Sequence, residues 1–162
     1  MNTKNNTLSI ASILFPSLNS SMAGISADIF FKGCKRHCPG CHNLELQTFA
    51  EPNHSVEEIL NLIEKHEIKI ITLMGGEPVD QPVDDILHLM KSIRDRFPSV
   101  KLSMYTGYEL DEIDTRILDF LDDIKTGAYR EDLRNKMGSF LASSNQKYFQ
   151  KDDCGVFVEV SV

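Results

Sequence analysis

Three cysteines within one short segment are the residues of this sequence best suited to chemistry. Cys34, Cys38 and Cys41 follow the spacing C-x3-C-x2-C. Closely spaced thiols in a chain of this length indicate metal ligation in a reducing compartment rather than disulfides. Three thiolates would leave one iron of a four-iron cluster without a protein ligand, and therefore open to a reactant. From the spacing alone, a structural zinc site completed by His42 or Cys154 remains an alternative.

A Gly-Gly-Glu-Pro sequence at residues 75–78 offers a second set of chemical groups. Gly75 and Gly76 would let a ligand approach the main chain, because they carry no Cβ. Glu77 would offer a carboxylate to a cationic group. Alone, this sequence is explained equally well as a strand-to-helix turn. Together with the cysteine segment it indicates a binding site.

Both motifs stand where a predicted strand ends. Apolar, β-branched segments predict strands at residues 27–32, 68–74, 100–105 and about 123–125. Each strand is followed by a loop with unusual residues, at 34–41, 75–78, 106–108 and 125–127. Because the carboxyl ends of parallel strands open onto one face, we expect these four loops to converge on one site.

Helical patterns fill the intervals between the strands. A capping box of Ser55 and Glu58 predicts a helix to about residue 66, and apolar periodicity predicts two more over residues 82–97 and 110–121. The alternation predicts βαβ units, hence an α/β fold with a mostly parallel sheet. A closed barrel takes roughly 250 residues, so this chain is expected to build a partial, open (β/α) barrel.

The two ends of the chain are expected to add strands to one domain that spans residues 1–162. An apolar segment at residues 8–14 predicts a strand whose partner the pattern does not assign. Residues 147–162 predict a hairpin or an edge strand. There Val156, Val158, Val160 and Val162 alternate with Phe157, Glu159 and Ser161 as in a half-buried strand.

Composition and charge exclude several classes of protein. With 41% hydrophobic and 25% charged residues, the 162-residue chain is globular rather than disordered. Its net charge of -7 argues against binding nucleic acid through phosphates. No apolar run reaches the roughly eighteen residues that a membrane span needs. Pro16 ends the N-terminal apolar run too early for a signal peptide, so we expect a cytoplasmic protein without membrane contact.

The motifs resemble those of a known family. The segments GCKRHCPGCHN (33–43) and GGEP (75–78) resemble radical S-adenosylmethionine enzymes, and among them the activating enzymes of glycyl radical enzymes. YTGYELDEI (105–113) and SSNQ (143–146) look like the short anaerobic ribonucleotide reductase activating proteins. The resemblance covers roughly residues 8 to 150.

The resemblance implies a set of cofactors and their binding residues. Cys34, Cys38 and Cys41 would hold one 4Fe-4S cluster, whose open iron would be chelated by S-adenosyl-L-methionine. The remaining cofactor-binding residues that it implies are Gly75, Gly76 and Glu77 for the methionine ammonium, with the adjoining Pro78 and Thr106, and Asp123 and Lys125 as a D-x-K motif whose lysine meets the cofactor carboxylate. Gly40 departs from the family, which often has an aromatic residue there beside the adenine. Backbone contacts from Gly40, Cys41 and His42 are expected to replace that ring.

The implied reaction is reductive cleavage of S-adenosylmethionine to a 5′-deoxyadenosyl radical, which abstracts hydrogen from a glycine of a partner protein. No side chain is catalytic in this scheme, because the cluster and the cofactor carry the chemistry. The implied partners are the anaerobic ribonucleotide reductase large subunit and a flavodoxin- or ferredoxin-like electron donor. Alternatives are another glycyl radical enzyme, a peptide or a small molecule as the target, or a non-catalytic zinc-binding module.

Overall fold

The structure is a computed structural model that describes residues 7–162, so residues 1–6 of the predicted single domain lie outside the described residues. Its strands are β1 (Thr7–Leu8), β2 (Ile10–Ser17), β3 (Ser26–Phe31), β4 (His54–Ser55), β5 (Ile70–Gly75), β6 (Lys101–Tyr105), β7 (Asp123–Thr126), β8 (Lys147–Lys151) and β9 (Phe157–Glu159). Its α-helices are α1 (Val56–Lys65), α2 (Val83–Arg96) and α3 (Thr115–Phe120). Short 3-10 turns are η1 (Leu44–Leu46), η2 (Pro78–Asp80), η3 (Leu110–Glu112) and η4 (Glu131–Leu133).

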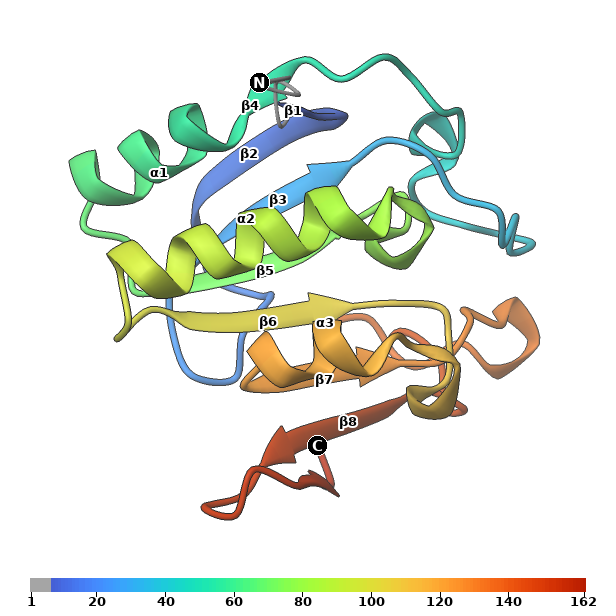
Figure 1. The fold of residues 1–162 in the computed structure, drawn as a ribbon. Helices are drawn as coiled ribbons and strands as arrows, with labels where there is room; N and C mark the ends of the chain where they lie inside the picture. The colour runs from blue at the N-terminus through green and yellow to red at the C-terminus, as the bar shows by residue number, and fades with distance from the viewer. Residues whose placement is uncertain (1–6) are drawn as a thin grey trace.

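The main sheet has the order β2-β3-β5-β6-β7-β8-β9, and the three helices lie on one face of it (Figure 1). The four central strands, β3, β5, β6 and β7, are parallel. β2 pairs antiparallel with β3 on one side, and β8 and β9 continue antiparallel on the other. The sheet is therefore mostly parallel at its centre and open at β2 and β9, as the sequence predicts. The predicted N-terminal strand corresponds to β2, and β3 is the partner that the sequence pattern left unassigned.

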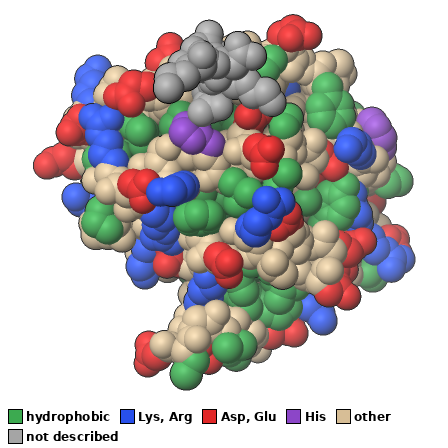
Figure 2. All heavy atoms as spheres, viewed as in Figure 1, with side chains coloured by type: hydrophobic (Ala, Val, Ile, Leu, Met, Phe, Trp, Pro, Cys, Tyr) green, Lys and Arg blue, Asp and Glu red, His purple; other side chains and the backbone are tan. Residues whose placement is uncertain are grey.

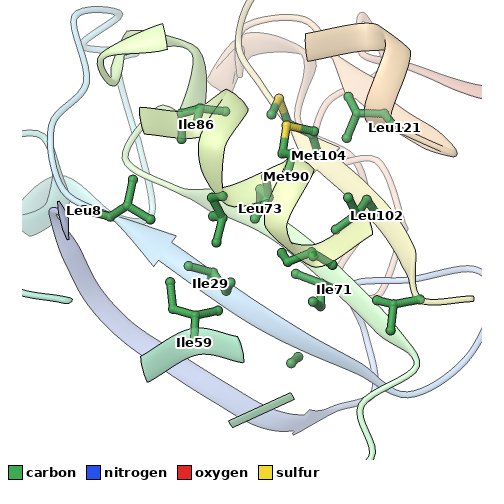
Figure 3. Close-up of a cluster of buried hydrophobic side chains, with 14 of the residues drawn as sticks. Leu8, Ile29, Ile59, Ile71, Leu73, Ile86, Met90, Leu102, Met104 and Leu121 are labelled. Carbon is green, nitrogen blue, oxygen red and sulfur yellow. The ribbon is translucent and has the colours of Figure 1, made fainter. Parts of the chain in front are cut away.

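Apolar side chains hold the helices against the sheet. Ile59 of α1 and Met90 of α2 meet Ile71 of β5 and Leu102 of β6, and all four are at most 1% exposed (Figure 3). Burying such a side chain stabilises the fold by roughly 1.5–3 kcal/mol. The predicted capping box of α1 is confirmed, because Ser55 and Glu58 bond each other's backbone N–H groups.

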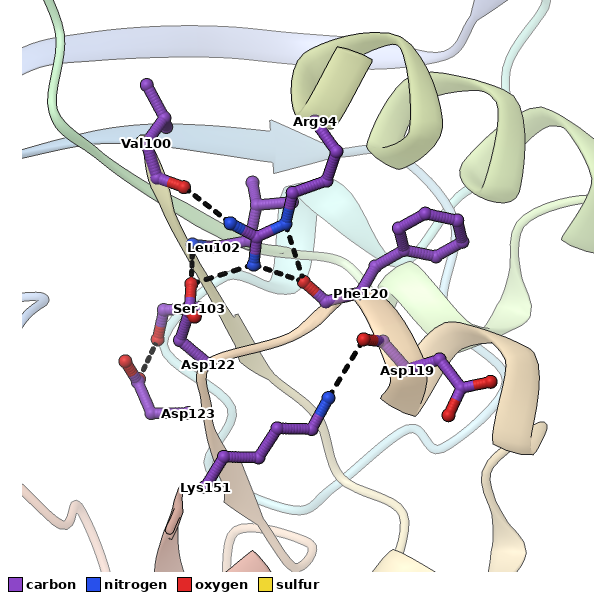
Figure 4. Close-up of polar contacts among 9 residues, drawn as sticks. All are labelled: Arg94, Val100, Leu102, Ser103, Asp119, Phe120, Asp122, Asp123 and Lys151. Carbon is purple, nitrogen blue, oxygen red and sulfur yellow. Dashed lines mark hydrogen bonds and ion pairs between the residues drawn. The ribbon is translucent and has the colours of Figure 1, made fainter. Parts of the chain in front are cut away.

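The opposite face of the sheet carries polar side chains. In register across the four parallel strands lie Asp28, Thr72, Ser103 and Asp123, each at most 7% exposed. The Ser103 hydroxyl donates to the Asp123 carboxylate (Figure 4). Thr72 donates to the carbonyl of Ser20, and Asp28 accepts the hydroxyls of Ser20 and Ser26, so the row is satisfied partly by the segment between β2 and β3. Because side chains on one face recur every second residue, Met74, Tyr105 and Lys125 stand on the same face, one step closer to the strand ends. The sheet thus presents a polar surface that leads to the strand exits.

Arg94 fixes α2 to the segment that precedes β7 (Figure 4). Its guanidinium donates to the carbonyl of Phe120 at 3.1 Å, to that of Val100 at 2.7 Å and to the Asp122 carboxylate at 2.8 Å. Asp122 also accepts the backbone N–H of Leu102 at 2.7 Å. These bonds align the starts of β6 and β7, and hence their exits.

The single helix predicted over residues 110–121 is wrong. The structure has the short turn η3, an extended Ile113 and then the six-residue α3. Asp114 causes the break, because its side chain accepts the N–H of Arg116 and caps a new helix start. The apolar residues still face the core, since Ile113, Ile117 and Leu121 are at most 5% exposed.

The strand predicted near the C-terminus is present as β9, with Val158 on its more exposed side. Val156 and Val158 are 57% and 49% exposed, whereas Phe157, on the other side of β9, packs against the core.

The face with the three helices carries acidic and basic side chains side by side (Figure 2). Several form ion pairs, such as Arg96 with Glu57 and Glu64 at 2.9 and 2.7 Å. Among the helices of residues 7–162, none is long and apolar enough to cross a membrane.

Candidate functional site

A pocket of about 200 Å³ lies at the exit edge of the parallel strands. In Figure 1 the arrows of β3 and β6 point toward this edge, where the loop after β3 also lies. The pocket wall is formed by Cys34, Arg36, Cys38, Cys41, His42, Asn43, Gln47, Met74, Gly75, Gly76, Glu77, Tyr105, Thr106, Gly107, Lys125, Gly127, Tyr129, Ala142 and Gln146. All four predicted loops therefore contribute to one site.

The three cysteines of the loop after β3 all line the pocket as free thiols. The Sγ atoms of Cys34 and Cys41 each accept a backbone N–H at 3.4 Å, from Arg36 and Asn43. Such bonds favour the thiolate, although burial raises the pKa of Cys34. Cys154 lies far from them in the exposed turn between β8 and β9.

The number of thiols at the pocket fits a 4Fe-4S cluster with one open iron. Among residues 7–162, no three His, Cys, Asp or Glu side chains are placed to hold one metal ion. In a 4Fe-4S cluster each thiolate binds a separate iron, so the thiols need not meet at one metal ion. Three thiols around one pocket, with no fourth cysteine in its wall, match that donor set.

Gly76 lets the turn after β5 pack directly on the cysteine loop. A Cβ atom at this position would lie 2.5 Å from the carbonyl oxygen of Gly33 and 2.8 Å from that of Leu46. The next residue continues the contact, because the N–H of Glu77 donates to the Gly33 carbonyl at 2.8 Å. The turn and the loop therefore form one backbone unit.

Glu77 is the carboxylate of this pocket, and it is 2% exposed. It accepts the N–H of Val79 at 3.1 Å and that of Gly107 at 2.7 Å. Burial raises the pKa of Glu77 to about 7, against the opposing effect of these hydrogen bonds. A cationic ligand in the pocket would stabilise the charged form and lower that pKa.

Lys125, on β7, brings a buried ammonium to the pocket. It is 9% exposed, and its Nζ lies 3.5 Å from the centre of the Tyr105 ring. Within the described residues, its hydrogen bond is to the carbonyl of Phe140 at 3.3 Å. Burial lowers the pKa of Lys125 to about 8. An anionic group of a ligand would supply a charge partner for Lys125.

Arg36 also reaches the pocket, which the sequence did not indicate. Its guanidinium lies 4.5 Å from the centre of the Tyr108 ring, and the Tyr108 hydroxyl donates to Asp80 at 2.6 Å. Asp80 accepts the N–H of Lys35 at 2.6 Å as well. These contacts join the loops after β3, β5 and β6.

Three of the predicted site residues stand outside the pocket wall. Pro78 is buried as the first residue of η2. Asp123 lies one step below Lys125 along β7, where it bonds Ser103. Gly40 has a φ of +73°, and a Cβ there would meet the Glu131 carboxylate at 2.6 Å. The other predicted residues, including Thr106, line the pocket.

The SSNQ segment anchors the pocket wall that follows β7. Gln146 accepts the N–H groups of Ala142 and Ser143 at 3.0 and 3.2 Å, and donates to the carbonyl of Gly127 at 3.0 Å. Its side chain also lines the pocket. Tyr129, two residues beyond Gly127, is a further wall residue that the sequence reasoning missed. The expectation that loops after parallel strands meet at one edge would include Tyr129 if the loop at 125–127 were extended by two residues.

Comparison with known proteins agrees with this geometry. Residues 23–149 match a family model described as a 4Fe-4S single cluster domain. The chain is 32% identical over 135 residues to the anaerobic ribonucleoside-triphosphate reductase-activating protein of Escherichia coli K12, covering 76% of this chain and 86% of that protein. It is 29% identical over 138 residues to the protein of the same name from Enterobacteria phage T4, covering 80% and 86%.

Among solved structures, the crystal structure of QueE from Escherichia coli is similar in fold. The TM-score is 0.56 at 14% sequence identity, and the match covers 80% of this chain and 78% of that one. At this identity the likeness concerns the fold alone.

Proposed function

Because the chain belongs to the family of anaerobic ribonucleoside-triphosphate reductase-activating proteins, we propose that its strand-exit pocket binds a 4Fe-4S cluster and S-adenosylmethionine and serves to activate that reductase. The observation that carries this proposal is the convergence of three free thiols, a buried carboxylate and a buried ammonium on one pocket. When bound, the cluster and S-adenosylmethionine supply an adenosyl radical that takes hydrogen from a glycine of the partner.

In this proposal the chain's own residues bind and orient. Cys34, Cys38 and Cys41 hold three irons, which leaves the fourth to the cofactor. Glu77 and the adjoining glycine backbone receive the cofactor ammonium, in the part of the pocket where burial strengthens the charge pairing. Lys125, which also lines the pocket, receives the cofactor carboxylate. The two contacts fix the amino-acid end of the cofactor in one orientation.

The partner is the large subunit of an anaerobic ribonucleotide reductase. The wall after β7 flanks the pocket without filling it, and His42 at the pocket is exposed. A loop of the partner would enter at this exit face. A flavodoxin- or ferredoxin-like protein would supply the electron, and the free thiols favour the reducing cytoplasm as the compartment.

Anaerobic reconstitution with iron and sulfide tests the proposal. We expect a brown protein that cleaves S-adenosylmethionine in the presence of dithionite. Incubation with the reductase large subunit should then give the doublet of a glycyl radical in electron paramagnetic resonance. A colourless protein that retains one zinc per chain would instead support a structural metal site. Cleavage without a glycyl signal, when other glycyl radical enzymes do give one, would assign a different target.

A further inference from the structure

Two aromatic side chains form the pocket wall beside the third cysteine. His42 directly follows Cys41, and Tyr129 comes from the loop after β7. Their ring centres are 5.3 Å apart at an angle of 48°, and both rings line the pocket. The pair joins two segments that are far apart in the sequence into one surface, which we call the aromatic wall.

Glu131 fixes Tyr129 within the aromatic wall. The Tyr129 hydroxyl donates to the Glu131 carboxylate, whose side chain lies over Gly40. Because a Cβ at position 40 would meet that carboxylate at 2.6 Å, no side chain fits there without displacing Glu131. The space beside the cysteine loop is therefore occupied from the other side of the pocket, by the segment that carries Tyr129.

The backbone on both sides of Tyr129 is also tethered. Asn145 donates to the carbonyl of Ala128 at 2.8 Å, and the N–H of Arg130 donates to the Ser143 hydroxyl at 3.2 Å. A tyrosine held by its own hydroxyl and by both neighbours presents a ring in a defined orientation. Tyr129 is only partly buried, so its ring remains accessible to a ligand.

We infer that Tyr129, backed by His42, is the surface on which the adenine ring of the cofactor stacks. The inference rests on the proposed function, because that function supplies a ligand with an adenine. Glu77 and Lys125, two of the charged groups that line the pocket, suit the amino-acid end of such a ligand. The purine is its remaining flat, weakly polar part, and an accessible aromatic face binds such a ring well.

Equilibrium binding to the reconstituted protein tests this inference with two probes. S-adenosylhomocysteine carries the adenine and is not cleaved, whereas methionine carries only the amino-acid end. We expect Tyr129→Leu to weaken binding of S-adenosylhomocysteine roughly tenfold, the usual effect of removing one aromatic ring under a base. Binding of methionine should not change. Tyr129→Phe keeps the ring and should bind both probes nearly as the wild type does.

Phe157→Leu is the control, because Phe157 is an aromatic residue of β9 that does not line the pocket. It should leave binding of S-adenosylhomocysteine unchanged. Iron content and thermal unfolding are measured for every variant, to show that each carries an intact site. Equal loss for both probes, equal loss in the Phe157 and Tyr129 variants, or wild-type affinity in Tyr129→Leu would each overturn the inference. If the wild-type protein itself neither binds nor cleaves an adenosyl ligand, the proposed function fails instead.

Discussion

The carboxylate of Glu77 accepts the backbone N–H of Gly107 at 2.7 Å, and this bond ties the exit of β5 to the exit of β6. Its other oxygen accepts the N–H of Val79, within the turn that follows β5. The same side chain thus organises two loops and faces the pocket. A change at Glu77 is expected to affect both stability and ligand binding.

Glu77→Gln should lower the affinity for S-adenosylmethionine about tenfold, because a neutral amide pairs less strongly with an ammonium in a buried pocket. The free energy of unfolding should fall by about 1–2 kcal/mol. The amide of Gln has one oxygen and one NH2 group, so only one of the two backbone N–H groups, of Val79 and Gly107, keeps its acceptor. Equilibrium dialysis and denaturant unfolding measure the two effects. Glu64→Gln, at an exposed ion pair, is the control. Loss of iron with unchanged cofactor affinity would contradict the assigned role.

Alanine at Cys34, Cys38 or Cys41 should abolish cluster assembly and cleavage of S-adenosylmethionine, since each thiolate holds a separate iron. Iron and sulfide content and the visible absorbance measure this directly. Cys154→Ala, in the exposed turn after β8, should retain both cluster and activity. Retained cleavage in any of the first three variants would show that the ligand set is wrong.

Lys125 should make stability depend on pH in the alkaline range. Burial lowers its pKa in the folded protein to about 8, from an ordinary value of 10.5. Above pH 8 the unfolded chain therefore holds more protons than the folded one. The free energy of unfolding should then rise with pH between about 8 and 10.5, by at most about 3 kcal/mol.

The Lys125→Met variant isolates this contribution. It should be more stable than the wild type near pH 7, and the difference should shrink as the pH approaches 10.5. Unfolding in urea, followed by circular dichroism of the cluster-free proteins, gives both curves. For Lys147→Met, at an exposed position of β8, the free energy of unfolding should change with pH as it does in the wild type. A constant difference between the wild type and Lys125→Met at every pH would contradict the prediction.

Gly76→Ala should separate the turn after β5 from the cysteine loop. Its methyl group would lie 2.5 Å from a backbone oxygen, which cannot move as a flexible side chain does. We expect a loss of roughly 2–3 kcal/mol in stability and a lower iron content after reconstitution. Gly138→Ala is the comparison, because no atom lies within 4 Å of its added methyl group. It bears only the strain of a positive φ, about 1 kcal/mol. Similar losses at both positions would show that packing at Gly76 is unimportant.

The sequence predicted the parts of the site that follow regular strands. Cys34, Gly76 and Lys125 stand at or directly after strand ends, and the parallel arrangement brings all of them to one edge. The rule needs only the strand pattern and the common direction of the strands. This is why the pocket was foreseeable without side-chain detail.

The segment from 127 to 146 was not foreseeable in the same way. Tyr129 and Ala142 reach the pocket from irregular backbone, which has no hydrophobic period to reveal its path. Side chains such as Asn145 and Gln146 fix that path by bonding backbone groups up to nineteen positions away. The helix that breaks at Asp114 has a similar cause, since one capping side chain overrode an apolar pattern.

The position of Gly33 has a thermodynamic consequence. Its carbonyl accepts the N–H of Glu77 at 2.8 Å, while its own N–H donates to Leu46 at 2.7 Å. Binding of the cofactor at the turn after β5 and binding of the cluster at the cysteine loop are therefore linked equilibria. If binding of one ligand raises the affinity for the other by some factor, binding of the second must raise the affinity for the first by the same factor. If the adenosyl ligand tightens metal binding, chelating agents should remove less metal at equilibrium from protein saturated with that ligand.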